Sequence, residues 1–179
     1  GSLSIANMTA VSSNTGFIRL ITDTSSGVTP ESVKSVAERL GLDGDNLGTA
    51  PTITLGVYNA NTTQMAGAYG TFAAGGVHRD PTSIMKVTDR SGNVLVDNTA
   101  GVEGKQVITD SVAYAVTQVL EGVIYNASYG TANAAALPSG QIAAGKTGTT
   151  DDWHDLWFVG YTPQLSCAVW TGSRDNSVQ

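Results

Sequence analysis

The chain has 179 residues, of which 41% are hydrophobic and 13% charged, enough for one sizeable core but not for two. Its formal net charge of −6, with only nine basic residues, argues against a nucleic-acid partner, because phosphates require basic patches. No apolar run in the sequence approaches the ~20 residues that a membrane-spanning helix needs. The lone Cys167 cannot form an internal disulfide, and its apolar surroundings predict a buried side chain.

Two helices are predicted in the first half of the chain. Thr29 caps the first, which has a proline in its first turn and ends at Gly41. Asn61 and Gln64 have the spacing of a capping box, and the second helix stops at residues 75–76. The apolar stripes of these helices are Val33, Val36, Ala37 and Leu40, and Met65, Tyr69, Phe72 and Ala73. Within the second helix, Gly67 and Gly70 indicate close packing against another element.

The second half predicts a hairpin, a helix and a terminal meander. Residues 83–88 and 93–97 read as two short strands joined by a turn, and Thr109 caps a third helix. Residues 156–162 and 165–172 are rich in aromatic and β-branched residues and are separated by a Pro-Gln turn. Helices followed by an antiparallel meander predict an α+β fold, with an antiparallel sheet flanked by helices.

Residues 140–147 match the phosphate-binding pattern G-x-x-x-x-G-K-[ST] at each fixed position. That pattern binds phosphate only when a buried strand precedes it and a helix opens directly after the lysine and threonine. Here residues 134–139 read as helix or loop, and Gly148, Thr149 and Thr150 lead into a strand. We therefore place Lys146 on the first of three consecutive antiparallel strands and disfavour a nucleotide site.

The other interpretation of Lys146-Thr147-Gly148 is a strand that lines an acyl-transfer site, as in penicillin-binding proteins and β-lactamases. A lysine ammonium and threonine hydroxyls at a sheet edge can hold a substrate carboxylate, and a glycine lets the substrate backbone approach the strand. For a motif of three residues alone, an exposed strand start with a solvated lysine is the simpler alternative.

Several segments, in the same order, resemble the transpeptidase domain of class A penicillin-binding proteins over essentially the whole chain. The segments are Ser12-Ser13-Asn14-Thr15, Ala68-Tyr69-Gly70-Thr71-Phe72-Ala73-Ala74-Gly75-Gly76, Gly130-Thr131-Ala132, and residues 145–150 through 157–163. The resemblance implies a D,D-transpeptidase whose serine attacks the D-Ala-D-Ala end of a peptidoglycan stem peptide, releases D-alanine and passes the acyl group to an amine. It implies that β-lactams acylate the same serine, and that no cofactor takes part. It also implies a location on the extracytoplasmic face of the bacterial membrane, with an anchor that lies outside these residues.

The resemblance assigns roles to five further positions. Ser12 relays a proton between the catalytic lysine and the leaving amine, and Asn14 hydrogen-bonds the substrate amide. Lys146 supplies positive potential beside the hydroxyls of Thr147 and Thr149, the latter meeting the substrate carboxylate and donating its N–H to the oxyanion hole. The alternative for Ser12 and Asn14 is a helix cap or turn, and for the threonines an ordinary place in a strand.

The nucleophile is the missing part of this pattern. The family requires Ser-x-x-Lys on a helix, ahead of Ser-x-Asn, and the chain offers only Ser83 and Lys86. In a strand, residues three apart lie ~10 Å apart, against ~5–6 Å on a helix, so we regard this match as a decoy. We expect residues 1–179 to be the C-terminal part of the domain, cut after its nucleophile and ending at Gln179 before a closing helix. The N-terminal part could complete the fold as a separate chain or a swapped neighbour.

Residues 151–155, Asp-Asp-Trp-His-Asp, invite a metal-site interpretation. Adjacent carboxylates and a lone His154, with His78 far away in sequence, lack an established ligand spacing. We therefore expect no metal and a solvated connection on which Trp153 packs down.

Two rival functions remain open. A β-lactamase-like hydrolase shares the Lys-Thr-Gly strand, but it needs a positioned base for the deacylating water, and no acid occurs in a matching context. A non-catalytic domain that binds a muropeptide reversibly is the second rival.

Overall fold

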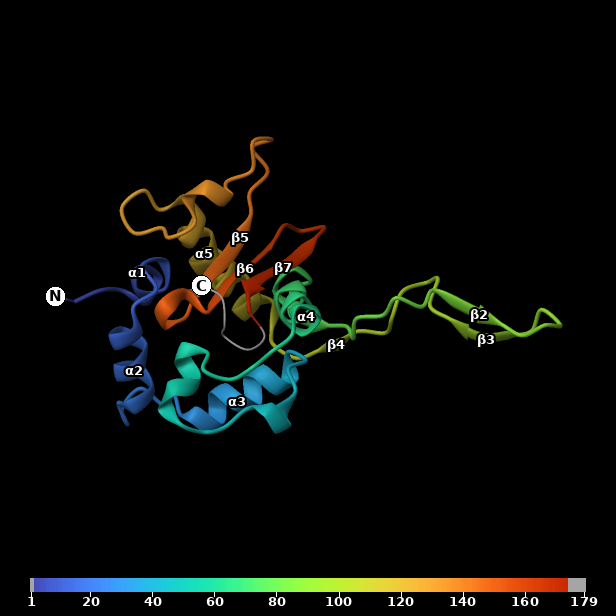
Figure 1. Cartoon of the computed structure of the whole chain (residues 1–179), viewed down its shortest axis with the longest axis horizontal. Coiled ribbons are helices and arrows are strands. Elements are labelled where there is room, and N and C mark those ends of the chain that lie inside the picture. Colours follow the sequence, from blue (N-terminus) through green and yellow to red (C-terminus); the bar gives the residue numbers. More distant parts are fainter. Residues whose placement is uncertain (1, 174–179) are drawn as a thin grey trace.

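The structure of the chain is a computed structural model that describes residues 2–173, so the predicted end at Gln179 lies outside the described residues (Figure 1). Along these residues, no helix is long and apolar enough to cross a bilayer. The elements are α1 Ile5–Ala10, α2 Asn14–Thr22, α3 Pro30–Arg39, α4 Thr62–Ala73, β1 Val77–His78, β2 Lys86–Thr88, β3 Val94–Asp97, β4 Lys105–Gln106, α5 Asp110–Tyr125, β5 Ala144–Thr149, β6 Asp155–Tyr161 and β7 Ser166–Gly172, with short 3-10 turns η1 Gly44–Asn46, η2 Pro51–Leu55, η3 Asn133–Ala135 and η4 Asp151–Trp153.

The terminal meander forms a three-stranded antiparallel sheet in the order β5-β6-β7. Lys146 lies opposite Val159 inside β5, so the prediction of a lysine on the first of three antiparallel strands is confirmed. The β6–β7 turn is closed by a hydrogen bond of 2.8 Å from the Thr162 amide to the Leu165 carbonyl. The mixture of helices and antiparallel strands confirms the predicted α+β class.

The three predicted helices begin at the predicted caps. Thr29, Asn61 and Thr109 each accept a hydrogen bond from a backbone amide three residues along the chain, which satisfies an otherwise unpaired donor of the first turn. The glycines of α4 lie against other elements, as their positions predicted. A Cβ on Gly67 would lie 3.3 Å from Pro81, and one on Gly70 would lie 3.6 Å from Ser166.

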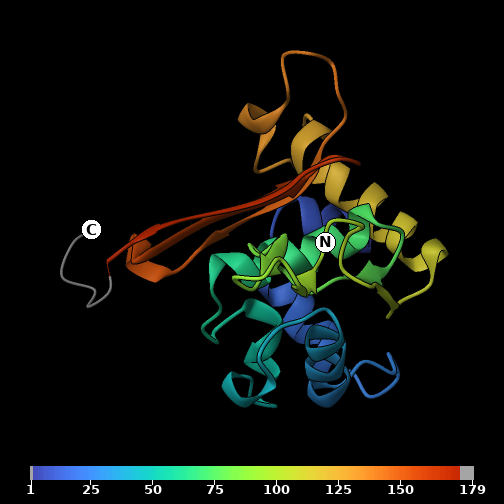
Figure 2. The ribbon, with the colours of Figure 1, turned by 90° about the vertical axis from the view of Figure 1, so that its right-hand side faces the viewer.

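The core lies between the sheet and helices α4 and α5, which contact each other. α5 packs against β5 and α4 against β6 and β7; Figure 2 shows the sheet nearly edge-on above α4. Val123 of α5 is fully buried and Tyr161 of β6 is 5% exposed. The buried Tyr161 hydroxyl is paired, because it forms a hydrogen bond of 2.8 Å with the Thr117 hydroxyl.

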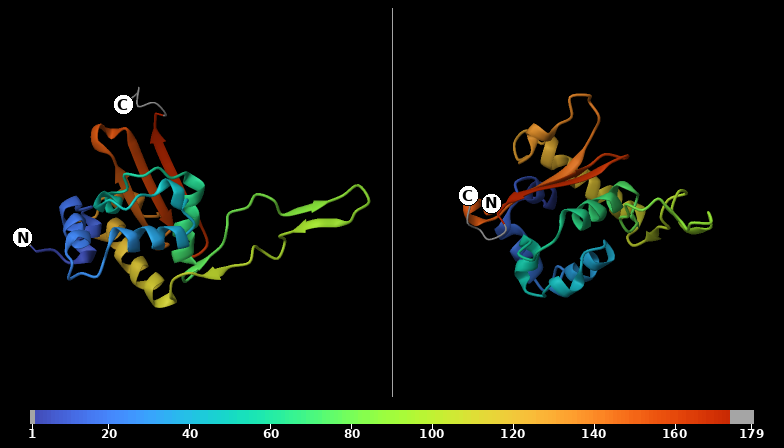
Figure 3. Two further views of the ribbon diagram at one scale, coloured as in Figure 1. Left: turned by 90° about the horizontal axis from the view of Figure 1, so that it is seen from below. Right: turned by 45° about the vertical axis from the view of Figure 1, so that its right-hand side comes forward.

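The chain between β1 and β4 forms an arm that extends away from the body and carries the β2–β3 hairpin at its tip (Figures 1 and 3). The predicted strand over residues 83–88 begins only at Lys86. The pairing continues one step before Lys86, where the Asn98 backbone N–H bonds the Met85 carbonyl at 2.7 Å, and the Asn98 side-chain amide then takes the Ile84 carbonyl at 2.8 Å in place of a backbone partner. Ser83 precedes these contacts, is exposed and lies on no helix, which removes the helical geometry that a Ser-x-x-Lys pair needs.

Two predictions of buried side chains are wrong. Cys167 is exposed, because its neighbour Ser166 faces α4, where its hydroxyl bonds the Ala66 carbonyl, so Cys167 points to the opposite face of β7. Trp153 is 69% exposed rather than packed down. Asp152 and Trp153 have left-handed backbone angles, with φ of 58° and 56°, and this turn carries the indole outward.

Gly145 tests how closely β5 packs against β6. A Cβ on Gly145 would lie 2.8 Å from the Val159 carbonyl oxygen and 2.9 Å from the Phe158 ring. We expect Gly145→Ala to lower the free energy of unfolding by about 1–3 kcal/mol, because the backbone contact cannot yield without shifting the sheet.

Gly122 is the matched control. A Cβ there meets nothing within 4 Å, and the residue lies inside helix α5. Gly122→Ala should raise stability by about 0.5–1 kcal/mol through helix propensity. Urea unfolding followed by tryptophan fluorescence measures both; equal effects of the two substitutions would contradict the packing described here.

Candidate active site

A cavity of about 740 Å³ opens between the α1–α2 turn, η2, α5 and β5. It brings together residues that are more than a hundred positions apart in the sequence. The six site residues named from the sequence all line it: Ser12, Asn14, Lys146, Thr147, Gly148 and Thr149. The structure thus places these six residues together around one cavity.

The direct link across the cavity joins Lys146 to Ser12. The Lys146 Nζ atom donates a hydrogen bond of 2.8 Å to the Ser12 Oγ atom and another of 2.8 Å to the Thr147 carbonyl. Burial lowers the pKa of the Lys146 ammonium from its ordinary value, because desolvation disfavours the charged form. Lys146 is therefore a partly desolvated cation whose position is fixed by two acceptors, and not a solvated lysine at a strand start.

Ser12 owes its place to an unusual turn between α1 and α2. Its φ of 55° is left-handed, a region that residues other than glycine enter at a cost of order 1–3 kcal/mol. The capping role that the sequence allowed for Ser12 and Asn14 belongs instead to Ser13, whose Oγ accepts from the Gly16 amide at 3.2 Å. The Ser12 hydroxyl thus remains available to Lys146, and Asn14 begins α2 with an exposed side chain.

The hydroxyl of Thr147 has a partner that the sequence analysis did not foresee. Thr131, on the loop after α5, places its Oγ1 atom 3.0 Å from the Thr147 Oγ1 atom. Thr131 entered the sequence analysis only as part of a short motif, with no role. Thr149 lies at the exposed end of β5, beside the same cavity.

An apolar wall forms the other side of the cavity. Val112, Val116 and Val119 follow one another along one face of α5, and Val112 is 48% exposed. Ile53 and Leu55 of η2 add to this wall. The sequence predicted the helix that Thr109 caps, but not that part of its apolar face would remain uncovered, and nothing in the sequence indicated η2.

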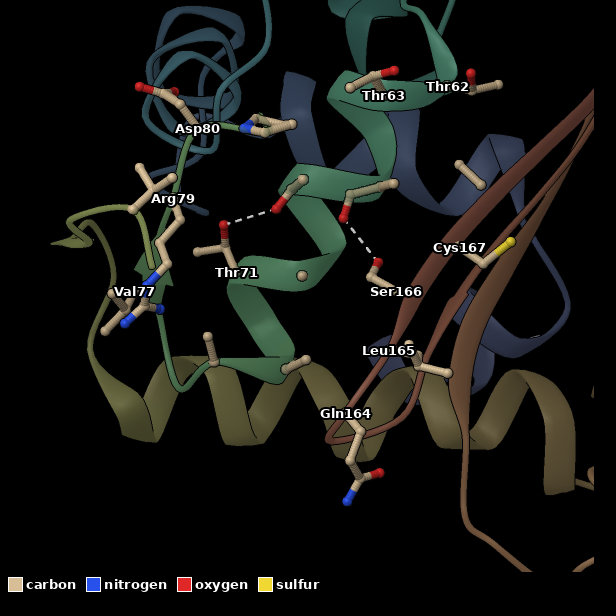
Figure 4. A pocket seen from close by; sticks show the side chains of 18 of the residues that line it. Thr62, Thr63, Thr71, Val77, Arg79, Asp80, Gln164, Leu165, Ser166 and Cys167 are labelled. Atoms are coloured by element: carbon tan, nitrogen blue, oxygen red, sulfur yellow. Dashed lines mark hydrogen bonds between the residues drawn. The ribbon is translucent and has the colours of Figure 1, made fainter. Parts of the chain in front are cut away.

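A second cavity, of about 730 Å³, lies between α4 and β7 (Figure 4). Two hydroxyl groups in the middle of its lining, those of Ser166 and Thr71, are engaged within the chain. Ser166 Oγ donates to the Ala66 carbonyl at 2.8 Å, and Thr71 Oγ1 donates to the Gly67 carbonyl at 3.0 Å. Because these hydroxyls already have acceptors and no lysine lies beside them in the lining, the chemistry is better placed in the first cavity.

The geometry excludes the phosphate-loop interpretation of residues 140–147. Lys146 sits inside an antiparallel strand and β5 continues to Thr149, so no helix N-terminus points amides at the lysine. In the acidic segment, the Asp155 carboxylate accepts a hydrogen bond of 2.8 Å from the Trp170 indole. Across residues 2–173, no group of three or more potential metal-ligating side chains comes together.

Comparisons with known proteins show which family the chain resembles. The family "Penicillin binding protein transpeptidase domain" matches residues 2–174. The chain is 35% identical to penicillin-binding protein 1A of Mycobacterium tuberculosis over 97% of its length, and 37% identical to penicillin-binding protein 1A of Clostridium acetobutylicum over 75%. It spans only 23% and 16% of the lengths of these two relatives.

Solved structures of penicillin-binding proteins superpose on the chain. The penicillin-binding protein PonA1 from Mycobacterium tuberculosis superposes with a TM-score of 0.83 at 33% identity, covering 99% of this chain and 50% of that chain. Its complex with penicillin V superposes with a TM-score of 0.81. Penicillin-binding protein 1A from Haemophilus influenzae, at 21% identity and a TM-score of 0.81, shares the fold.

The strained turn at Ser12 generates one prediction. Ser12→Gly and Ser12→Ala both remove the hydroxyl that Lys146 bonds, but only glycine adopts a φ of 55° without strain. We expect the glycine variant to be more stable than the alanine variant by about 1 kcal/mol in urea unfolding. An alanine variant that matched or exceeded the glycine variant would show that the turn is not strained.

The buried charge of Lys146 generates a second prediction. Because its pKa is lowered in the folded state, the cost of burying the charge is fully present at neutral pH. That cost is relieved as the pH rises through the lowered pKa towards the ordinary lysine value of about 10.4. The unsubstituted protein should therefore gain stability relative to Lys146→Met as the pH rises from neutrality towards the ordinary lysine pKa. Urea unfolding of both proteins at each pH measures this gain; a constant or shrinking difference would contradict the lowered pKa.

Proposed function

The chain belongs to the penicillin-binding protein transpeptidase family, and from this premise we propose that it forms the substrate-holding side of a serine D,D-transpeptidase site that cross-links peptidoglycan stem peptides. The observation that carries the proposal is the contact of 2.8 Å between Lys146 Nζ and Ser12 Oγ at one end of a cavity lined by Asn14 and β5. Such a pair supplies a cation and an orientable hydroxyl where a peptide carboxylate and a leaving amine need them.

The proposed reaction is an acyl transfer in two steps. A serine oxygen attacks the carbonyl carbon of the penultimate D-alanine, the C–N bond to the terminal D-alanine breaks, and that residue leaves as a free amine after taking up a proton. An acceptor amine then attacks the acyl-serine carbonyl and releases the serine hydroxyl. A β-lactam follows the first step only, because its leaving nitrogen stays tethered to the acyl group. The structure of PonA1 with penicillin V supports a β-lactam ligand for this site.

The residues of this chain divide the work in that reaction. Ser12, held by Lys146, delivers the proton to the leaving amine, and Asn14 holds the substrate amide. Thr149, with Thr147 beside it, binds the terminal carboxylate next to the Lys146 charge. The backbone N–H of Thr149 stabilises the oxyanion of the tetrahedral intermediate, a type of contact whose loss costs about 3–4 kcal/mol in other enzymes.

We further propose that the nucleophilic serine and its lysine come from a segment outside residues 1–179. The sole Ser-x-x-Lys match in the sequence is at Ser83, on the arm and outside the lining of the cavity. A helix with an apolar face would fit the partly exposed wall of Val112, Val116 and Val119 and bring its serine towards Ser12. This segment can belong to the same polypeptide, to a separately folded N-terminal part or to a swapped neighbour. The whole protein would act at the extracytoplasmic face of the membrane, where stem peptides are found.

A hydrolytic function fits the cavity less well. A serine hydrolase of this type needs a base to activate the deacylating water, and among the described residues the cavity lining contains no aspartate or glutamate. Without such a base the acyl-enzyme persists until an amine arrives, which favours transpeptidation over β-lactam hydrolysis.

The proposal predicts different outcomes for the chain alone and for the protein that carries it. Incubated with a fluorescent penicillin, residues 1–179 should gain no covalent mass, because they lack the nucleophile. The full-length protein should gain one adduct per molecule, and Lys146→Met should slow that acylation at least about 10-fold through loss of the charged contact. Intact-mass spectrometry reads both. A stoichiometric adduct on residues 1–179 would place the nucleophile within them, and no adduct on the full-length protein would reject the transpeptidase proposal.

A further inference from the structure

Thr131 contacts the candidate site through one residue of β5, Thr147. Its hydroxyl lies 3.0 Å from that of Thr147, and Thr131 itself is not among the residues that line the cavity. Thr147 does line the cavity, next to Lys146. Any effect of Thr131 on a ligand must therefore pass through the Thr147 hydroxyl.

The loop that carries Thr131 is fixed against the end of α5. The Gly130 amide donates to the Asn126 carbonyl at 2.8 Å, and the Ala132 amide donates to the Val123 carbonyl at 3.0 Å. A Cβ on Gly130 would lie 2.6 Å from the Asn126 oxygen, so this close approach requires glycine. Ala132 is 7% exposed and belongs to the core. The two flanking residues thus anchor the loop and fix where the hydroxyl between them sits.

A threonine hydroxyl has one hydrogen to donate and two lone pairs to accept with. If Thr147 donates to Thr131, only lone pairs face the cavity, and they repel an anion. If Thr131 donates to Thr147, the Thr147 hydrogen is free to point into the cavity. Beside the Lys146 ammonium an anionic ligand favours the second arrangement, because a hydrogen bond to a carboxylate is stronger than one between neutral groups.

We propose that Thr131 is a positioning residue that donates its hydroxyl hydrogen to Thr147, so that Thr147 donates to the carboxylate of the substrate's terminal D-alanine alongside Thr149. This inference rests on the proposed function, which supplies the carboxylate. Thr131 touches neither the substrate nor the reacting atoms; it orients and polarises a group that does. Its contribution therefore lies in the non-covalent step that precedes acylation.

The expected effect is weaker binding, because the Thr147 hydroxyl is no longer oriented and polarised towards the carboxylate. Thr131→Val keeps the shape of the side chain and removes its donor, which leaves the Thr147 hydroxyl free to rotate. The dissociation constant of the non-covalent complex with a β-lactam carboxylate should rise about 3- to 10-fold, whereas the rate constant of acylation should stay within about 2-fold. Thr131→Ser retains the donor and should behave as the unsubstituted protein does.

Stopped-flow kinetics of the full-length protein with a chromogenic cephalosporin separates the two constants. The matched ligand is the methyl ester of the same cephalosporin, which lacks the anionic carboxylate. With the ester, Thr131→Val and the unsubstituted protein should bind equally. In a Thr147→Val background, Thr131→Val should add no further loss, because the two hydroxyls act as one unit.

Four results would overturn the inference. They are equal carboxylate affinities for Thr131→Val and the unsubstituted protein, an equal loss with the ester, losses that add in the double variant, and an equal loss with Thr131→Ser, which would assign the effect to packing rather than to the hydroxyl. Failure of the proposed function gives a different signature, namely no acylation of the unsubstituted protein. In that case, the dissociation constant of N-acetyl-D-alanine, measured by NMR titration of the Thr147 methyl signal, tests the role of Thr131. Equal dissociation constants for Thr131→Val and the unsubstituted protein would reject the inference, and about 3- to 10-fold weaker binding would support it.

Discussion

The site depends on one hydrogen bond between distant parts of the chain, from the Lys146 ammonium inside β5 to the Ser12 hydroxyl in the α1–α2 turn. Holding the long Lys146 side chain at Ser12 costs rotamer entropy. That cost is smallest when the strand and the turn that carry the two residues are themselves fixed. β5 fixes Lys146 by pairing with β6, and the left-handed turn fixes Ser12. The strain in the turn and the desolvation of the lysine are costs that the surrounding packing offsets.

The rest of the described structure can be understood as support for that contact. α5 packs its buried side against β5 and leaves its other side to line the cavity, so one helix positions both the strand and the wall opposite it. The loop after α5 returns to β5 and places Thr131 against Thr147. Strand, turn, helix and loop thus converge on a space whose one end is cationic and rich in hydroxyls and whose other side is apolar. This division suits a peptide end that carries a carboxylate beyond an apolar methyl group.

Local signals predicted much of the fold, whereas contacts between distant segments were beyond them. Capping residues and apolar spacing gave the helices that follow Thr29, Asn61 and Thr109, and the aromatic runs gave the meander that contains Lys146. The exposed Trp153 was predicted wrongly because two consecutive left-handed residues have no sequence signature unless glycine is present. Cys167 was predicted wrongly because a strand's composition does not tell which of its two faces is covered. The resemblance to a family suggested the candidate site residues, which the structure brings to one cavity, but the partner of Thr147 required coordinates.

The central claim is that the Ser12–Lys146 contact and the adjoining end of β5 hold the carboxylate end of an acyl-transfer substrate. A crystal structure of the full-length protein acylated by a penicillin tests it most directly. The account predicts that the ligand carboxylate lies within hydrogen-bond distance of Thr149 and Thr147, that Ser12 remains bonded to Lys146, and that the acylated serine lies outside residues 1–179. A penicillin carboxylate bound away from β5, or an acyl group on the arm at Ser83, would contradict it.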